Sequence, residues 1–177
     1  MKLKYVAAAA LLVTGLGAQA VTTDWGVHAP IEIGASIPSA GSFVDTFLFE
    51  IAPAPHTVSS TAVANNLGGG AIFNIVGGKY SLWSAGGNGV VGGGDDSKLS
   101  ADFLFNGLSG NTTNAVVLST GKYFYSVTGS ATGLFGGFYT LTSTIVPIQA
   151  VPEPETYAML LAGLGAVGFL ARRRKND

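Results

Sequence analysis

The chain has 177 residues, of which 11% are charged and 47% are hydrophobic, and it contains 26 glycines and no cysteine. This composition is too apolar for a disordered chain, and the length suits one sizeable domain rather than two. The lack of cysteine excludes a disulfide scaffold, thiol catalysis and thiolate metal sites. Residues 21–151 carry three lysines against seven acidic residues, a net charge of −4, so we expect no nucleic-acid binding.

The first 20 residues have the order of parts of a secretory signal peptide. Two lysines precede an apolar stretch over residues 6–16, and Ala18 and Ala20 supply the small side chains that a signal peptidase requires before its cleavage site. We therefore expect residues 1–20 to form a signal helix that is removed on export. A retained membrane anchor is the alternative, but the apolar run is only about half as long as a bilayer span requires.

Residues 21–151 alternate apolar and polar side chains, are rich in Val, Ile, Thr, Phe and Tyr, and show no sustained helical period. The sequence thus predicts an all-β domain, a single β-sandwich or jelly roll. Antiparallel pairing is expected because nothing resembles a crossover helix. The expected strands cover residues 42–51, 56–64, 71–76, 79–84, 99–105, 115–118, 122–129 and 137–146.

The first expected strand places a carboxylate among apolar side chains. Asp45 shares one face of this strand with four of them: Phe43, Phe47, Phe49 and Ile51. Because an unsatisfied buried charge is strongly destabilising, we interpret Asp45 as a structural tie to backbone N–H groups of a neighbouring loop. A calcium ligand and a catalytic acid are the alternatives.

Glycine is concentrated in the middle of the chain, with eleven glycines between residues 68 and 94. Such density is typical of mobile loops around short strands. Asp95 and Asp96, which follow directly, and Asp102 could offer oxygen ligands to calcium, and a solvated turn is the alternative. We expect no resident metal ion and no cofactor.

The last two expected strands suggest a hairpin. Tyr123 and Tyr125 share one face of their strand, and Tyr139 and Leu141 share one face of the next. Residues 130–136 between the strands include turn-forming glycines, so we expect the two strands to pair and to bury these faces in the core. An exposed tyrosine pair that stacks on sugar rings is the alternative.

Sequence motifs of catalysis are absent. His28 and His56 are the only histidines, neither lies in an HExxH frame, and the chain has no GxSxG or GxxxxGK motif. A spatial arrangement of one histidine with Asp45 and a serine stays open, because catalytic triads assemble in space. We expect no enzymatic activity and assign no catalytic residue.

Residues 152–177 combine a polar stretch, an uncharged run and a basic cluster. The polar stretch is 152–155 with Pro152, Glu153 and Pro154; the uncharged run is 156–171; the basic tail is 172–177 with Arg172, Arg173, Arg174 and Lys175. At about 1.5 Å per residue, the uncharged run is a marginal transmembrane helix. The basic residues are then a stop signal that stays cytoplasmic, which places residues 21–151 outside the cytoplasm.

This tail resembles the PEP-CTERM sorting signal of Gram-negative bacteria. The resemblance implies recognition by an exosortase, a transpeptidase-like membrane enzyme that cuts near the Pro-Glu-Pro motif and releases the protein toward the cell surface. The segment Phe43-Val44-Asp45-Thr46-Phe47 is similar to the FxDxF pattern of one subgroup, and the predicted hairpin looks like the closing hairpin of that subgroup. A permanent single-span anchor is the alternative to cleavage.

The sequence therefore predicts an exported, non-catalytic protein of the cell surface or extracellular matrix, with a precursor anchored in the inner membrane. Its expected partners are signal peptidase, the exosortase, the membrane and an exopolysaccharide such as that of a biofilm. A carbohydrate- or calcium-binding surface module is the rival hypothesis. A hydrolase that uses Asp45 is the third.

Overall fold

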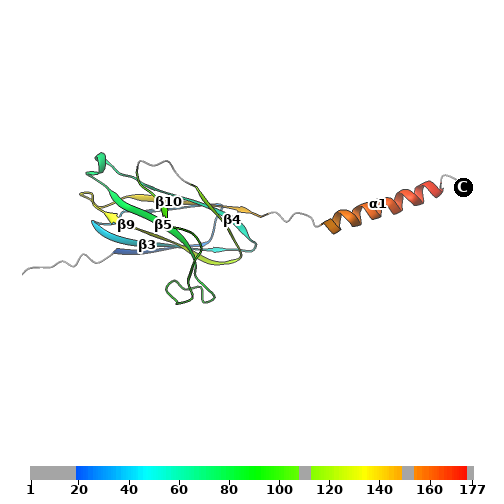
Figure 1. Cartoon of the computed structure of the whole chain (residues 1–177), viewed down its shortest axis with the longest axis horizontal. Coiled ribbons are helices and arrows are strands. Elements are labelled where there is room, and N and C mark those ends of the chain that lie inside the picture. The colour runs from blue at the N-terminus through cyan, green and yellow to red at the C-terminus, as the bar shows by residue number, and fades with distance from the viewer. Residues whose placement is uncertain (1–18, 108–112, 149–153, 175–177) are drawn as a thin grey trace, which may run out of the picture. The chain divides into compact units, whose positions relative to one another are not determined.

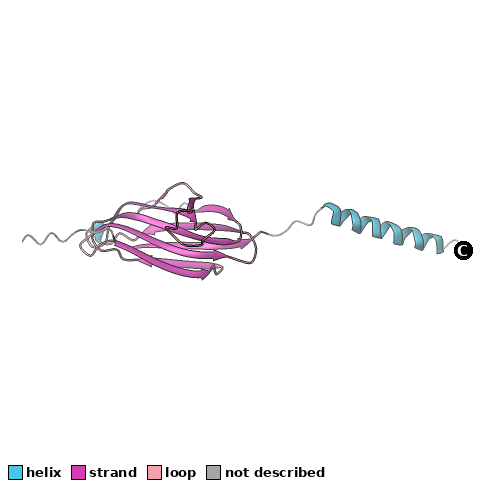
Figure 2. Cartoon of the chain, turned by 90° about the horizontal axis from the view of Figure 1, so that it is seen from below, coloured by secondary structure: helices cyan, strands magenta, loops and turns pink. Residues whose placement is uncertain are grey.

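The computed structural model describes residues 19–107, 113–148 and 154–174. The chain divides into two compact units, Met1–Pro147 and Ile148–Asp177. The first unit consists of two packed β-sheets (Figures 1 and 2). The predicted all-β sandwich is thus confirmed. Residues 1–18 of the predicted signal helix, Ala18 among them, lie outside the described residues. Its last two residues, Gln19 and Ala20, form the start of a strand and not part of a helix.

The larger sheet has six strands among the described residues. Its order is β1 (Gln19–Val27), β3 (Gly41–Ile51), β9 (Gly121–Ala131), β5 (Ile75–Ser84) and β6 (Ser97–Lys98), and β7 (Phe103–Leu104) also pairs with β5. The smaller sheet has the order β2 (Ile31–Ser36), β10 (Tyr139–Pro147), β4 (His56–Ala64) and β8 (Asn114–Leu118). The pairs are antiparallel, as predicted, except that β1 runs parallel to β3.

The strands with the clearest alternation are where the sequence predicts them. β3, β4, β8, β9 and β10 begin and end within two residues of their expected bounds. β1 and β2 were not predicted. The predicted strand 71–76 is wrong over residues 71–74, because a 3-10 turn (Gly68–Gly70) with Gly69 at a φ of 66° comes first and β5 begins only at Ile75.

β5 also runs through the glycine pair that the sequence suggested as a break. Gly77 has a φ of 62°, and the register of β5 against β9 shifts between Val76 and Lys79. A glycine in this left-handed conformation is typical of a β-bulge, which bends a strand without ending it. The predicted strand 99–105 is shorter than expected and is regular only at Phe103–Leu104.

The predicted hairpin between residues 122–129 and 137–146 is wrong. β9 lies between β3 and β5 in the larger sheet, whereas β10 lies between β2 and β4 in the smaller sheet. The connection between them carries the chain from one sheet to the other. The two strands therefore face each other across the core, where the Tyr125 hydroxyl lies 2.9 Å from the Ser143 hydroxyl.

The core between the sheets is largely aromatic. The Phe49 ring stacks on Tyr125, with centroids 5.2 Å apart, and Phe43 stacks on Tyr139 at 5.7 Å. Tyr125 is 1% exposed, so the core role predicted for this tyrosine is confirmed and its sugar-stacking alternative is wrong. The sheets approach closely at Gly34 in β2, where a Cβ atom would overlap the Phe47 ring.

The second unit contains the helix α1 (Pro154–Arg174), which includes the predicted uncharged run 156–171. The sequence predicted that this run crosses a membrane. In the described part of the chain, no helix is both long and apolar enough for such a crossing. The uncharged run has 16 residues, fewer than the roughly 20 that a bilayer span needs.

Candidate functional site

Asp45 lies on β3 and its carboxylate is 1% exposed. Its Oδ2 atom accepts a hydrogen bond of 2.7 Å from the Tyr139 hydroxyl on the opposite sheet, and its Oδ1 atom accepts one of 3.2 Å from the Val21 backbone N–H. The tie to a backbone N–H agrees with the prediction, although the donor lies in strand β1 instead of a loop. Burial, together with the hydrogen bond and the negative charge of Asp45, raises the pKa of Tyr139, so this hydroxyl remains a donor.

His28 and Ser143 form a second buried polar cluster with Tyr125. The His28 Nδ1 atom lies 2.5 Å from the Ala29 carbonyl oxygen, which can only accept, so this nitrogen carries the proton of the neutral ring. The Nε2 atom, 2.8 Å away from the Ser143 oxygen, then accepts the Ser143 proton, and Ser143 in turn accepts from Tyr125. Burial lowers the pKa of His28 and favours this neutral form.

This cluster resembles a catalytic pair only in its residue types. Ser143 is 0% exposed, so a substrate has no route to its hydroxyl in this structure. Asp45 binds Val21 and Tyr139, not the histidine. The triad that the sequence left open from His28, Asp45 and a serine is therefore not assembled. His56 is also buried, and its Nδ1 atom lies 2.7 Å from the Ala54 carbonyl oxygen.

The three aspartates proposed as calcium ligands do not converge. Asp102 pairs with Lys79, at 3.0 Å, and with Lys98. Asp95 accepts a hydrogen bond from the Asn88 backbone N–H, and Asp96 accepts one from Gly92. Across the described residues, no group of three or more histidine or acidic side chains could hold a metal ion. The described structure therefore does not bring Asp95, Asp96 and Asp102 together as a set of calcium ligands, and it pairs Asp45 with Val21 and Tyr139.

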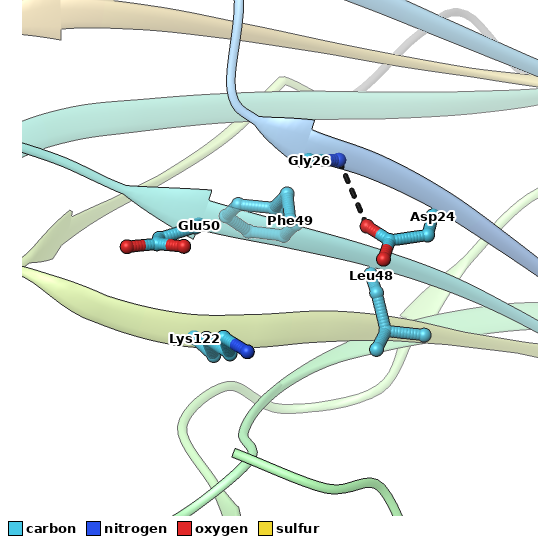
Figure 3. Close-up of a pocket in the computed structure, with 6 residues that line it drawn as sticks. All are labelled: Asp24, Gly26, Leu48, Phe49, Glu50 and Lys122. Atoms are coloured by element: carbon cyan, nitrogen blue, oxygen red, sulfur yellow. Dashed lines mark hydrogen bonds between the residues drawn. The ribbon is translucent and has the colours of Figure 1, made fainter.

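A small pocket lies where β1, β3 and β9 run side by side (Figure 3). Its volume is about 100 Å³, and it is lined by Asp24, Gly26, Leu48, Phe49, Glu50 and Lys122. The Asp24 carboxylate accepts a hydrogen bond of 2.8 Å from the Gly26 backbone N–H, so it stabilises the turn of its own strand. The volume of this pocket is far below that of a typical ligand pocket, so we assign no ligand to it.

A larger open groove lies on the outer face of the larger sheet. We call it the outer groove: it measures about 270 Å³ and is lined by Val44, Thr46, Trp83, Val91, Gly92, Asp96, Phe124 and Ser126. Trp83 on β5 is the register partner of Phe124 on β9, and their rings lie 6.0 Å apart and 12° from parallel. The Lys98 ammonium lies 5.9 Å from the Trp83 ring centroid.

The glycine-rich loop forms the other wall of the outer groove. Gly92, with a φ of 79°, donates its N–H to the Asp96 Oδ2 atom at 2.6 Å. The Asp96 Oδ1 atom is buried and has no hydrogen-bond partner among the described residues. The outer groove thus combines an aromatic pair, the hydroxyls of Thr46 and Ser126, and the side chain of Asp96.

Sequence reasoning missed the outer groove. Trp83 and Phe124 are far apart in the chain, and only the register of β5 against β9 brings them together. The alternation in both strands was a usable signal, since it places Trp83 and Phe124 on the face opposite to Tyr80 and Tyr125. The register itself could not be derived from these patterns.

The C-terminal unit carries the residues predicted for sorting. Helix α1 begins at Pro154 and includes Arg172, Arg173 and Arg174 in its last turn, whereas Pro152, Glu153 and Lys175 lie outside the described residues. Residues 150–175 match the protein-family model described as the PEP-CTERM protein-sorting motif. The chain carries a PEP-CTERM sorting signal. This motif implies processing by an exosortase, and PEP-CTERM proteins are exported and associated with the membrane or the surface.

Comparisons of the rest of the chain concern its fold. No curated protein matches this chain. One similar solved structure is the pre-peptidase C-terminal domain of collagenase from Bacillus anthracis, at 17% sequence identity and a TM-score of 0.36, over 70% of this chain and 94% of that chain. The FxDxF subgroup stays a prediction from Phe43, Asp45 and Phe47.

Proposed function

We propose that this PEP-CTERM protein is a non-catalytic component of an extracellular polysaccharide layer or biofilm matrix. Signal peptidase removes residues 1–20, and the exosortase cuts near residues 152–154 and releases the β-sandwich toward the surface. The sorting motif at residues 150–175 is the observation that carries this proposal. The complete burial of Ser143 beside His28 supports a non-catalytic role, because the pair lacks access to a substrate.

Intact-mass spectrometry of protein recovered from the cell exterior tests the sorting route. The mature mass should correspond to loss of residues 1–20 and of the segment that follows the Pro-Glu-Pro motif. In cells without the exosortase, the C-terminal segment should stay on the protein. If surface material from normal cells kept residues 172–175, the protein would be permanently anchored and the cleavage step would be wrong.

The outer groove supports carbohydrate binding as a second function of the same domain. Flat aromatic rings such as Trp83 offer an apolar face to the C–H groups of a sugar ring, and nearby polar groups fix its orientation. Thr46, Ser126 and Asp96 supply such polar groups beside the aromatic pair. This role would hold the exported sandwich within the polysaccharide layer.

Titration calorimetry with polysaccharide extracted from the extracellular matrix of the same cells tests this second function. Trp83→Ala should weaken binding at least about tenfold, since stacked aromatic contacts dominate such sites. Phe135→Ala is the matched control, because Phe135 is an exposed aromatic residue, 64% accessible, that does not line the outer groove. Equal binding by both variants and the unaltered protein would exclude the outer groove as the sugar site.

A further inference from the structure

The predicted signal cleavage site lies beside the buried carboxylate of the sandwich. The Ala18-Gln19-Ala20 segment predicts cleavage after Ala20, which makes Val21 the first residue of the exported chain. The Val21 nitrogen is the same atom that lies 3.2 Å from Asp45 Oδ1. Signal removal would therefore create a new charged group within hydrogen-bonding distance of Asp45.

Asp45 has no cationic partner within the described part of the chain. The ion pairs there join Asp102 to Lys79 and Lys98, and the two hydrogen-bond donors to Asp45 are a neutral amide and a neutral hydroxyl. The side chain is nevertheless 1% exposed. Two neutral donors leave part of the hydrogen-bonding capacity of this buried carboxylate unused, and an opposite charge at hydrogen-bonding distance would compensate its desolvation further.

We propose that signal-peptide removal completes a buried ion pair between the Val21 α-ammonium group and the Asp45 carboxylate. In the cleavage step, water adds across the Ala20–Val21 peptide bond. The carbonyl carbon of Ala20 takes the hydroxyl and leaves with the signal peptide as a carboxylate. The Val21 nitrogen keeps its hydrogen and gains two protons, one from water and one from the newly formed acid, and so becomes an ammonium group with three donors.

The strand pairing keeps the new terminus in place. Cleavage removes the pairs of Gln19 with Phe43 and of Ala20 with Val44, but the parallel pairing of β1 with β3 continues from Val21 opposite Asp45 through Asp24. Thr22 and Thr23 stay paired with Thr46 and Phe47. The ammonium group is therefore held by the residues that follow it, and a distance of 3.2 Å already falls within the range of an ion pair.

This ion pair would link stability to export. The precursor offers the Asp45 carboxylate one backbone N–H, whereas the mature chain offers a full positive charge at the same atom, which adds a Coulombic attraction to that hydrogen bond. The sandwich would gain this stabilisation only after the signal peptide has been cut, which happens on the far side of the membrane. A chain that still has to cross the membrane would thus be the less stable form.

The test compares chains that differ by one residue at the N-terminus. Residues 21–177 and residues 20–177 are each released from a removable N-terminal fusion partner, with and without Asp45→Asn, and are unfolded in urea. The chain that begins at Val21 should have a folding equilibrium constant about tenfold larger than the chain that begins at Ala20, as expected when an opposite charge is added beside a carboxylate. Asp45→Asn should remove this difference.

A purely structural role of β1 predicts the opposite order. The chain that begins at Ala20 keeps the pairing of Ala20 with Val44, so strand pairing alone would make it the more stable of the two. Equal stability, or greater stability of the Ala20 chain, would overturn the ion pair. N-terminal sequencing of the exported protein checks the cleavage itself, and a first residue other than Val21 would also overturn the proposal.

A second measurement covers the case in which Asp45→Asn prevents folding. Limited acylation with an amine-reactive reagent, followed by mass spectrometry of the N-terminal peptide, reports how accessible the α-amine is in the folded chain. The Val21 amine should react at least about tenfold more slowly than the Ala20 amine of the longer chain, because an ion-paired ammonium is a poor nucleophile. Equal rates would contradict the pair. The inference rests on the removal of residues 1–20 that the proposed function includes. The unfolding and acylation results do not depend on polysaccharide binding or on exosortase cleavage, so they can fail while the matrix role stands.

Discussion

The space between the two sheets and the outer face of the larger sheet use similar residues for different purposes. Between the sheets, Asp45, His28 and Ser143 each have partners and almost no exposure. On the outer face, Trp83 and Asp96 border an open groove, and one oxygen of Asp96 has no partner among the described residues. The residue types that usually signal catalysis lie here in buried contacts between the sheets, and the proposed ligand site lies on the outer face.

Replacing one aromatic residue on each face gives the largest expected contrast. Tyr125→Ala should lower the free energy of unfolding by about 3 to 5 kcal/mol, because it empties a site that is filled by stacked rings and removes a hydrogen bond to Ser143. Trp83→Ala should lower it by about 1 kcal/mol, since Trp83 is only partly buried. Urea unfolding measures both. Comparable losses would contradict the distinction between the two faces.

The hydrogen bond from Tyr139 to Asp45 joins the two sheets, and removing it tests how much the buried polar groups stabilise the fold. Tyr139→Phe keeps the ring that stacks on Phe43 and deletes only the hydroxyl that donates to Asp45. The expected loss is about 1 to 3 kcal/mol, because the buried carboxylate is left with one donor fewer. In an Asp45→Asn background the same change should have less effect. Additive losses in urea unfolding would show that the two residues are not coupled.

The two faces also differ in how far the sequence could predict them. The alternation of apolar and polar residues predicted which side chains of β3 point into the core, including that of Asp45, because this two-residue period depends on local backbone geometry alone. The sequence could not predict the hydrogen-bond partner of Asp45. Tyr139 lies in the other sheet, whereas we expected its strand to form a hairpin with β9. β1 was not predicted, and its first two residues, Gln19 and Ala20, lie in the segment that the sequence assigns to the signal peptide.

The pH dependence of stability reports on His28 between the sheets. Burial lowers the pKa of His28 and outweighs the hydrogen bond to Ala29 and the charge of Glu32, which raise it. The unfolded chain, with a His28 pKa of 6.5, therefore binds more protons than the folded chain just below that pH. The free energy of unfolding should fall as the pH drops below 6.5, until the folded form also takes up the proton.

His28→Gln is the control for this titration. Glutamine lacks the titrating ring, so the fall in unfolding free energy below neutral pH should be smaller than in the unaltered protein, whatever the stability of the variant at neutral pH. Thermal or urea unfolding between about pH 8 and 5 measures both slopes. Parallel pH profiles would show that His28 gains its proton as easily in the folded chain as in the unfolded one.

The smallest effect is expected at the exposed end of the outer face, where Asp102 pairs with Lys79 and Lys98. These lysines lower the pKa of Asp102, first through the hydrogen bond from Lys98 and then through that from Lys79. Solvent and salt screen such pairs, and ordering the side chains offsets the attraction. Asp102→Asn should leave urea unfolding nearly unchanged at high salt, with at most a slight loss at low salt. A large loss that persists at high salt would mean that charges on this face stabilise the fold as the buried groups do.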